Sequence, residues 1–278
     1  MNIELITSPA NPRVKFAAGL RDAKNRRREN RFLIDGAPSI HVALDAGVQI
    51  AEIFVSQQAW DRPDAQIASL SRRTAGEPMR WTCLSEAAMQ KIQYGQQDQQ
   101  LIAVAIPLDT SIDTLSARAS VTASSSSHEL FLVLDRLEKP GNLGAAMRTA
   151  DAAGATAVLL SDPACDPWNP NAIRASLGAI FTVPIASGSW HDIFSWLSYR
   201  SVRCFAARTD KTAPYWSISY PEKTAIVIGS EAHGLEDRWK SDEILPVHIP
   251  MFGKIDSLNA SITGSILLFE VIRQRPTH

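Results

Sequence analysis

The second half of the sequence contains six short, continuously apolar runs separated by stretches with helical spacing. They cover residues 130–134, 157–160, 182–186, 204–207, 225–228 and 247–249. A strand that is apolar at successive positions is buried on both faces, which is typical of a parallel sheet covered by helices. The runs therefore predict an α/β fold with an open parallel sheet over residues 129–278. A last helix is predicted over residues 258–273.

The first 106 residues predict a smaller domain in which strands and helices also alternate. Strand-like segments at 31–35, 50–55, 79–82 and 101–106 are separated by helical segments at 38–46, 64–73 and 85–91. Together they suit a small α/β/α domain over residues 1–106. Serine-rich polar runs follow at residues 107–128, a composition typical of a flexible linker, so the domain boundary is predicted there.

Positive charge is concentrated at the start of the chain. Residues 1–31 hold eight Lys and Arg residues and three acids, a net charge of +5, whereas the whole chain carries −1 and the other 247 residues carry −6. Residues 11–30 combine these cations with apolar residues in a pattern that suits a short amphipathic helix with a positive outer face. The asymmetry indicates contact with a polyanion.

Membrane and metal functions have no support in the sequence. No apolar run approaches the roughly 20 residues that span a bilayer, and the first residues lack the basic and apolar regions of a signal peptide. No membrane partner and a cytoplasmic location are therefore expected. Cys83, Cys165 and Cys204 have no spacing typical of zinc sites or disulfide frameworks. We expect buried free thiols and no metal.

Three polar clusters follow predicted strands of the parallel sheet. They occupy residues 138–148, residues 228–235, and residues 249–251 continued by 257–260. The carboxyl ends of parallel strands form the ligand crevice of an open α/β sheet. A helix that begins in such a loop offers free N–H groups and the positive end of its dipole to a ligand. The three clusters together therefore indicate a binding site.

Common nucleotide and hydrolase sites do not fit these clusters. Gly141 and Gly144 have the spacing Gly-x-x-Gly, not Gly-x-Gly-x-x-Gly, and no Gly-x-x-x-x-Gly-Lys-Ser/Thr sequence occurs. A carboxylate at Glu231 disfavours a bound phosphate and suits a neutral or cationic ligand. No Ser/His/Asp arrangement and no metal-ligand spacing is present.

Four of the polar side chains in the clusters also have a purely structural alternative. Asn142 could cap the helix that follows it, and Ser257 or Asn259 could cap the last helix. Glu231 could be a plain surface residue. Arg148 is predicted near the start of its helix, where the dipole disfavours a cation, so an anionic partner explains it better.

In this order and at these spacings, the three clusters resemble the signature motifs of the SpoU (TrmH-type) family of RNA 2′-O-methyltransferases in the SPOUT superfamily. The resemblance covers about residues 130–275. Residues 6–15, Arg26-Arg27-Arg28 and residues 32–36 are similar to the ribosomal-protein-like RNA-binding domain that precedes the catalytic domain in many members. The resemblance implies that residues 129–278 form a SPOUT domain with a deep trefoil knot.

The resemblance also implies a cofactor and an oligomeric state. The cofactor is S-adenosylmethionine, held in the knot largely by backbone groups of the second and third clusters, and family members act as homodimers. The implied cofactor-binding residues are Ala207, Gly229, Ile249, Met251, Leu258 and Ala260.

The catalytic residues follow from the same resemblance. They are Asn142, Arg148, Glu231, Ser257 and Asn259. Family precedent makes the arginine matching Arg148 the base for the 2′-hydroxyl, but an arginine side chain essentially never loses its proton in proteins. We therefore expect Arg148 to grip the target phosphate and orient the hydroxyl, with any role as base confined to the RNA-bound state. The expected RNA-binding residues are Arg13, Lys15, Arg26, Arg27 and Arg28.

The expected function is S-adenosylmethionine-dependent 2′-O-methylation of a structured RNA. Ribosomal RNA is favoured over tRNA because an RNA-binding domain precedes the catalytic domain. The alternatives are a tRNA 2′-O-methyltransferase and a catalytically silent RNA-binding or ribosome-assembly factor on the same fold.

Overall fold

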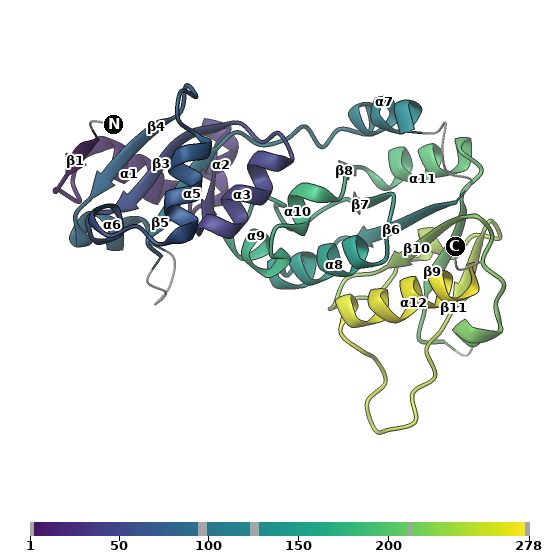
Figure 1. The fold of residues 1–278 in the computed structure, drawn as a ribbon. Coiled ribbons are helices and arrows are strands. Elements are labelled where there is room, and N and C mark those ends of the chain that lie inside the picture. Colours follow the sequence, from purple (N-terminus) through teal and green to yellow (C-terminus); the bar gives the residue numbers. More distant parts are fainter. Residues whose placement is uncertain (1–2, 94–98, 123–127, 211–212, 276–278) are drawn as a thin grey trace. The chain divides into compact units, whose positions relative to one another are not determined.

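The chain divides into two compact units. The computed structural model describes residues 3–93, 99–122, 128–210 and 213–275. Unit 1 comprises Met1–Leu108 together with Asp166–Thr182, and unit 2 comprises Asp109–Cys165 together with Val183–His278. Figure 1 shows the elements of each unit along the chain. Among the described residues, no helix is long and apolar enough to cross a membrane.

Unit 1 contains a mixed five-stranded sheet with the order β1-β4-β3-β5-β2. Strands β1, β4 and β3 are parallel, whereas β5 runs antiparallel to both β3 and β2. The strands are β1 (Glu4–Ile6), β2 (Phe32–Asp35), β3 (Ile50–Ser56), β4 (Arg80–Leu84) and β5 (Leu101–Ala105). The four strands predicted for this part are confirmed, and β1 is an addition that the sequence did not signal.

Helices complete the α/β/α arrangement of unit 1. They are α1 (Pro12–Gly19), α2 (Ala23–Glu29), α3 (Ala37–Asp45), α4 (Gln57–Asp61), α5 (Ala65–Arg73) and α6 (Glu86–Ile92). Leu33, Phe54 and Val104 of the sheet form one buried cluster with α1 and α6. Because successive residues of a strand point to opposite faces, Phe32 belongs to the other face, where α3 packs against β2 and α5.

The prediction of one amphipathic helix over residues 11–30 is wrong, because the chain turns between α1 and α2. Asp22 has extended backbone angles and caps α2, where its side chain accepts hydrogen bonds from the amides of Lys24 and Asn25 at 2.8 and 3.3 Å. An aspartate that bonds the amides two and three residues ahead competes with a continuous helix. The positive segment is therefore two short helices.

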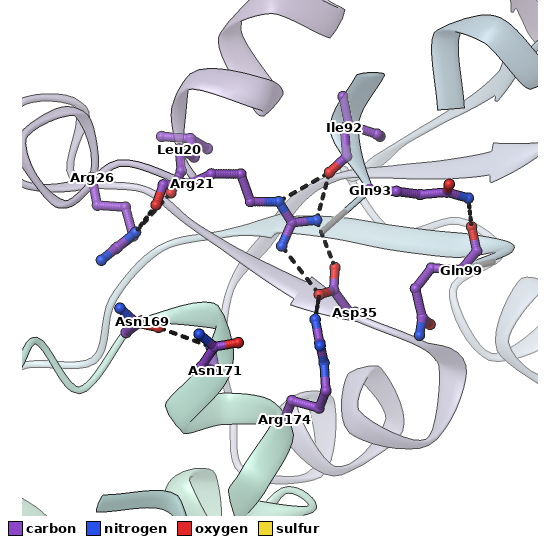
Figure 2. Close-up of polar contacts among 10 residues, drawn as sticks. All are labelled: Leu20, Arg21, Arg26, Asp35, Ile92, Gln93, Gln99, Asn169, Asn171 and Arg174. Atoms are coloured by element: carbon purple, nitrogen blue, oxygen red, sulfur yellow. Dashed lines mark hydrogen bonds and ion pairs between the residues drawn. The ribbon is translucent and has the colours of Figure 1, made fainter. Parts of the chain in front are cut away.

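Residues 166–182 lie between two strands of unit 2 in the sequence but fold with unit 1. They contain α9 (Pro170–Ser176) and α10 (Ala179–Thr182). The ring of Phe32 lies 4.9 Å from that of Trp168 and 6.2 Å from that of Phe181, centroid to centroid. Asp35 accepts hydrogen bonds from Arg21 at 3.0 Å and from Arg174 at 3.2 Å, as Figure 2 shows. Aromatic packing and ion pairs thus attach this segment to β2.

Unit 2 is built on a six-stranded sheet with the order β11-β9-β10-β6-β7-β8, and every neighbouring pair is parallel. The strands are β6 (Glu129–Asp135), β7 (Ala157–Ser161), β8 (Ile185–Gly188), β9 (Arg203–Ala207), β10 (Lys223–Ile228) and β11 (Ile244–Val247). The open parallel sheet is confirmed. The third run is displaced, because Thr182 ends α10 and the strand begins at Ile185, and the last strand ends at Val247 rather than residue 249.

Helices cover both faces of this sheet. They are α7 (Ile112–Thr122), α8 (Pro140–Ala152), α11 (Trp190–Tyr199) and α12 (Ala260–Gln274), with short 3₁₀ turns η1 (Tyr215–Ser217) and η2 (Asp237–Trp239). Residues of α7 and α11 share a core with alternate sheet residues such as Phe131 and Val227. On the other face α12 packs on α8, β6 and β10.

The serine-rich run contains more order than a linker composition suggests. Helix α7 begins at Ile112, and Leu115 is buried in the core of unit 2. Apolar residues three positions apart give even a polar helix one face that can pack. Residues 123–127 lie outside the described residues. The domain boundary at 107–128 and the trefoil knot stay predictions.

Candidate active site

The three polar clusters meet at one edge of the unit 2 sheet. The first follows β6, the second follows β10 and the third follows β11. Leu134 pairs with Ile228 near the ends of β6 and β10, and Ala207 pairs with Val247 at the ends of β9 and β11. Because all these strands are parallel, their carboxyl ends lie together and form the expected crevice edge.

A chain of hydrogen bonds joins one side chain from each cluster. Asn142 donates through Nδ2 to the carboxylate of Glu231. Asn259 donates through Nδ2 to Oδ1 of Asn142 at 3.0 Å. Each amide thus uses its donor on one neighbour and its acceptor on another. The structure brings these three predicted residues together although 89 and 117 positions separate Glu231 and Asn259 from Asn142.

Asn142 and Asn259 have different positions at the amino ends of α8 and α12. Lys139 occupies the N-cap position of α8 without a side-chain cap, and Pro140 is the first helical residue, so the alternative that Asn142 caps α8 is wrong. Asn259 is the N-cap of α12, where its Oδ1 accepts from the amide of Ser261 at 2.9 Å. The capping alternative for Asn259 is confirmed, but its Nδ2 remains available and reaches Asn142. Asn259 thus caps α12 and also holds Asn142 in the chain of hydrogen bonds.

Arg148 and Ser257 stand apart from this chain of hydrogen bonds. Both are exposed, and neither side chain makes a hydrogen bond or ion pair with the part of the protein that the structure describes. Because α8 begins at Pro140, Arg148 lies in its third turn, beyond the reach of the N-terminal dipole. The predicted conflict with the dipole is therefore wrong. An exposed cation without a protein partner remains free to bind an anion.

Glycine is required at position 229 because the backbone there passes very close to the backbone of Gly234. A Cβ built on Gly229 would lie 2.2 Å from the carbonyl carbon and 2.4 Å from the oxygen of Gly234. Ser230 and Gly234 exchange two backbone hydrogen bonds of 3.1 and 3.0 Å, and Gly234 has a φ of 63°. The second cluster is thus a tight turn that closes on its own backbone directly after β10.

The remaining predicted cofactor residues flank this turn. Ala207 ends β9, and Ile249 and Met251 follow β11. Leu258 is half-buried and Ala260 is the first residue of α12. The tight turn after β10, closed against the backbone of Gly229, and the amides at the start of α12 suit a ligand that is recognised through backbone groups. These residues fit S-adenosylmethionine, and their assignment to it stays a prediction.

One contact between α8 and α12 was not expected from the sequence. The hydroxyls of Thr149 and Ser265 lie 2.7 Å apart. Since Asn142 also bonds Asn259, contacts seven residues on in α8 and six on in α12 show that these helices run parallel. Hydroxyl residues about two helical turns after each asparagine are the signal that could have revealed this pairing.

The predicted RNA-binding residues differ in accessibility. Lys15, Arg27 and Arg28 are exposed, and Arg28 pairs with Glu29. Arg13 is half-buried between the carboxylates of Glu4 and Glu52. The side chain of Arg26 is only 3% exposed. Its Nε donates to Asp166 at 2.7 Å. Its Nη1 donates to the carbonyls of Leu20 and Arg21 at 3.0 and 2.9 Å (Figure 2).

Arg26 therefore has a structural function in unit 1 and no surface for phosphate. Arg26→Met is expected to lower the free energy of unfolding by about 3 kcal/mol, because it removes the buried cation that pairs with Asp166 and the donor of two backbone carbonyls. Arg27→Met, one residue away and exposed, is expected to change it by less than about 0.5 kcal/mol. Urea unfolding monitored by tryptophan fluorescence measures both. Equal stabilities of the two variants would contradict the assignment.

The three cysteines are buried thiols outside any disulfide, as predicted. Burial raises the pKa of the Cys204 thiol to about 12, which keeps it protonated and unreactive at neutral pH.

Comparison with known proteins places this geometry in a family. The model of the SpoU rRNA methylase family matches residues 129–269, and that of the MRM3-like substrate-binding domain matches residues 11–103. The 23S rRNA (guanosine(2553)-2′-O)-methyltransferase RlmP of Bacillus subtilis is 27% identical over 96% of this chain and 98% of its own. The crystal structure of an RNA 2′-O ribose methyltransferase superposes with a TM-score of 0.78 at 33% identity, covering 97% of this chain and 98% of that one. An S-adenosylmethionine-bound rRNA methyltransferase from Sinorhizobium meliloti superposes with a TM-score of 0.84 at 26% identity, covering 99% of each chain.

The family model and the S-adenosylmethionine-bound structure that superposes on the whole chain define the class, an S-adenosylmethionine-dependent methyltransferase. The chain belongs to the SpoU rRNA methylase family. The predicted family, the enzyme class and the cofactor are confirmed.

Proposed function

We propose that the protein transfers a methyl group from S-adenosylmethionine to a ribose 2′-hydroxyl of ribosomal RNA. The observation that carries the proposal is the hydrogen-bonded chain of Asn142, Glu231 and Asn259 at the crevice edge, with an unpaired Arg148 on the same helix as Asn142. Relatives that align with nearly the whole chain are named for RNA 2′-O-methylation, which supports the reaction type.

The side chains at the site bind and orient the nucleotide. A ribose hydroxyl is a weak nucleophile because its pKa lies well above neutrality, so its proton must be polarised or removed. The bound cofactor supplies an electrophilic methyl group. Arg148 binds the phosphate next to the target ribose and donates to the hydroxyl oxygen, where it stabilises the negative charge that develops as the hydroxyl proton passes to water, while its guanidinium stays protonated.

Asn142 and Glu231 hold the reacting ribose against this arginine. The second N–H of Asn142 and the less occupied Oε2 of Glu231, whose nearest donor is the Glu138 amide at 3.4 Å, remain available to a nucleotide. Preorganised groups of this kind act without rearrangement when the reaction occurs. Ser257 lies exposed next to the cofactor-binding segment and contacts the substrate.

Unit 1 supplies the sequence-independent part of RNA binding. Lys15, Lys24 and Arg27 are exposed on α1 and α2, and none has an ion-pair partner in the part of the chain that the structure describes. Lysine and arginine on short helices match the phosphate and shape contacts by which structured RNA is recognised. Ribosomal RNA is favoured over tRNA because relatives that align with nearly the whole chain, this domain included, are named for methylation of 23S rRNA.

The protein acts as a homodimer in this proposal, and in the cytoplasm, where ribosomal RNA is modified. Ile262 and Phe269 are 50% and 49% exposed and lie seven residues apart on α12, which places them on one helix face. An apolar face of this kind suits a second copy of the chain. Sedimentation of the intact protein tests the stoichiometry.

Two measurements test the reaction. Calorimetry with S-adenosylmethionine should show binding to the purified protein, and transfer of a labelled methyl group should occur to ribosomal RNA in preference to tRNA. Mapping of 2′-O-methylation in RNA from cells with and without the gene then identifies the nucleotide. A protein that binds ribosomal RNA but not the cofactor would instead be the silent assembly factor, and preferential labelling of tRNA would favour the tRNA enzyme.

A further inference from the structure

A single arginine, Arg238, connects the loop after the second cluster to the ends of two strands. It lies in η2. Its Nη2 donates to Oδ1 of Asp135 at 2.9 Å, and its Nη1 donates to Oδ2 of Asp162 at 2.6 Å. The guanidinium carbon lies 5.9 Å from the ring centroid of Trp190. One planar group thus reaches the carboxyl ends of β6 and β7 at once, a geometry that suits arginine and not lysine.

The guanidinium of Arg238 neutralises the negative charge of the Asp135 carboxylate. The residue is fully buried, and Oδ1 also accepts from the hydroxyl of Ser161 at 2.7 Å. Oδ2 is buried without a hydrogen-bond partner among the described residues. Arg238 is the only cation with which Asp135 forms an ion pair in that part of the chain. A buried carboxylate that lost its cation would be strongly unfavourable.

The two strand ends also leave the sheet through uncommon backbone conformations. Arg136 follows β6 with a φ of 54°, and Asp162 follows β7 with a φ of 41°. Residues other than glycine rarely adopt this region, and they remain there where surrounding contacts hold them. Arg238 binds the side chain of Asp135, which precedes Arg136, and the side chain of Asp162 itself.

The Arg238 contact and the polar chain of the active site join the same two loops. Asp135 precedes Asn142 by seven residues, and Glu231 precedes Arg238 by seven residues. The loops are therefore joined at a buried end by Asp135 and Arg238, and at the crevice by Asn142 and Glu231. Trp239 is fully buried against Trp190 and Phe194, so the far end of the second loop is fixed in the core.

We propose that Arg238 is a positioning residue for methyl transfer. It sets the place of the loop that carries Glu231 relative to the loop that carries Asn142, and so keeps these two side chains in the geometry that meets the ribose. The proposal rests on the methyltransferase function above. In this proposal the loss of Arg238 lowers kcat even when the buried charge of Asp135 is removed at the same time.

Three variants and one control test it. Arg238→Gln should lower kcat about tenfold or more, because small displacements of orienting groups are costly to the reaction. Arg238→Lys should recover only part of the loss, since one ammonium does not span both carboxylates. In Asp135→Asn/Arg238→Gln the buried charge is also removed, so thermal stability should return while kcat stays low. Lys240→Gln, which breaks only the exposed pair with Asp237 in the same loop, should match the wild type.

Hydrogen exchange of the free protein provides a readout without cofactor or RNA. Peptides covering residues 229–236 should exchange faster in Arg238→Gln and in the double variant than in the wild type. Recovery of both stability and kcat in the double variant, or unchanged exchange in this loop, would overturn the proposal. Failure of the wild type to methylate any RNA would instead refute the proposed function, and the exchange result would still decide whether Arg238 orders the loop.

Discussion

Arg148→Ala is expected to lower methyl transfer to ribosomal RNA at least about a hundredfold while cofactor affinity stays nearly unchanged. The side chain is exposed and has no partner within the described residues, so its removal disturbs no contact that the structure shows. Its loss would leave the target phosphate and hydroxyl without their orienting cation. Single-turnover transfer of a labelled methyl group measures the rate, and calorimetry measures the cofactor affinity.

A second exposed arginine of unit 2 supplies the control for this variant. Arg203 lies at the amino end of β9, away from the carboxyl edge where the clusters meet. Arg203→Ala should therefore transfer methyl groups at the wild-type rate. Arg148→Lys keeps the charge but loses the planar donors, so a partial rate is expected. A parallel loss of cofactor affinity and rate in Arg148→Ala would show that Arg148 serves the cofactor instead.

Gly229→Ala is expected to abolish cofactor binding and to destabilise unit 2 by several kcal/mol. The added methyl group would lie 2.2 Å from backbone of Gly234 and 2.5 Å from the amide nitrogen of Leu235. No backbone atom can yield by the necessary distance without opening the turn, and overpacking of less rigid sites already costs about 1–3 kcal/mol. Calorimetry with S-adenosylmethionine and thermal unfolding measure the two effects.

Gly141→Ala is the matched control for Gly229→Ala. A Cβ at Gly141 meets nothing within 4 Å, and the residue lies in the first turn of α8. Alanine there should leave cofactor binding intact and stabilise the helix by up to about 1 kcal/mol. If Gly229→Ala retained both wild-type stability and cofactor affinity, the close approach of the two backbone segments would not exist in solution.

The parallel sheet and the three clusters were predictable because each depends on short stretches of sequence. Uninterrupted apolar runs indicate strands buried on both faces, and polar residues directly after them fall at one edge by topology alone. The partner of each polar side chain was not predictable. Asn142 could be a helix cap or a site residue, and only the tertiary position of Glu231 distinguishes the two.

Burial of charged residues is the second property that the sequence could not supply. From the sequence alone, the three side chains of Arg26-Arg27-Arg28 all look like parts of a positive surface. Helical geometry turns Arg26 inward toward Asp166, which is 140 residues away, and leaves Arg27 outside. The position of Arg148 shows a related limit. An argument from the helix dipole depends on where the helix begins, and sequence pattern alone places helix ends only to within about one turn.

The attachment of residues 166–182 to unit 1 has a consequence for chimeric enzymes. The substrate-binding unit is not a contiguous cassette, since β2 is packed against α9 and α10, which the chain enters only after β7. A graft of residues 1–108 onto another catalytic sheet would leave Phe32 uncovered and the Asp35 carboxylate without Arg174. An exchange of RNA specificity between relatives must therefore transplant two separate pieces of the gene together.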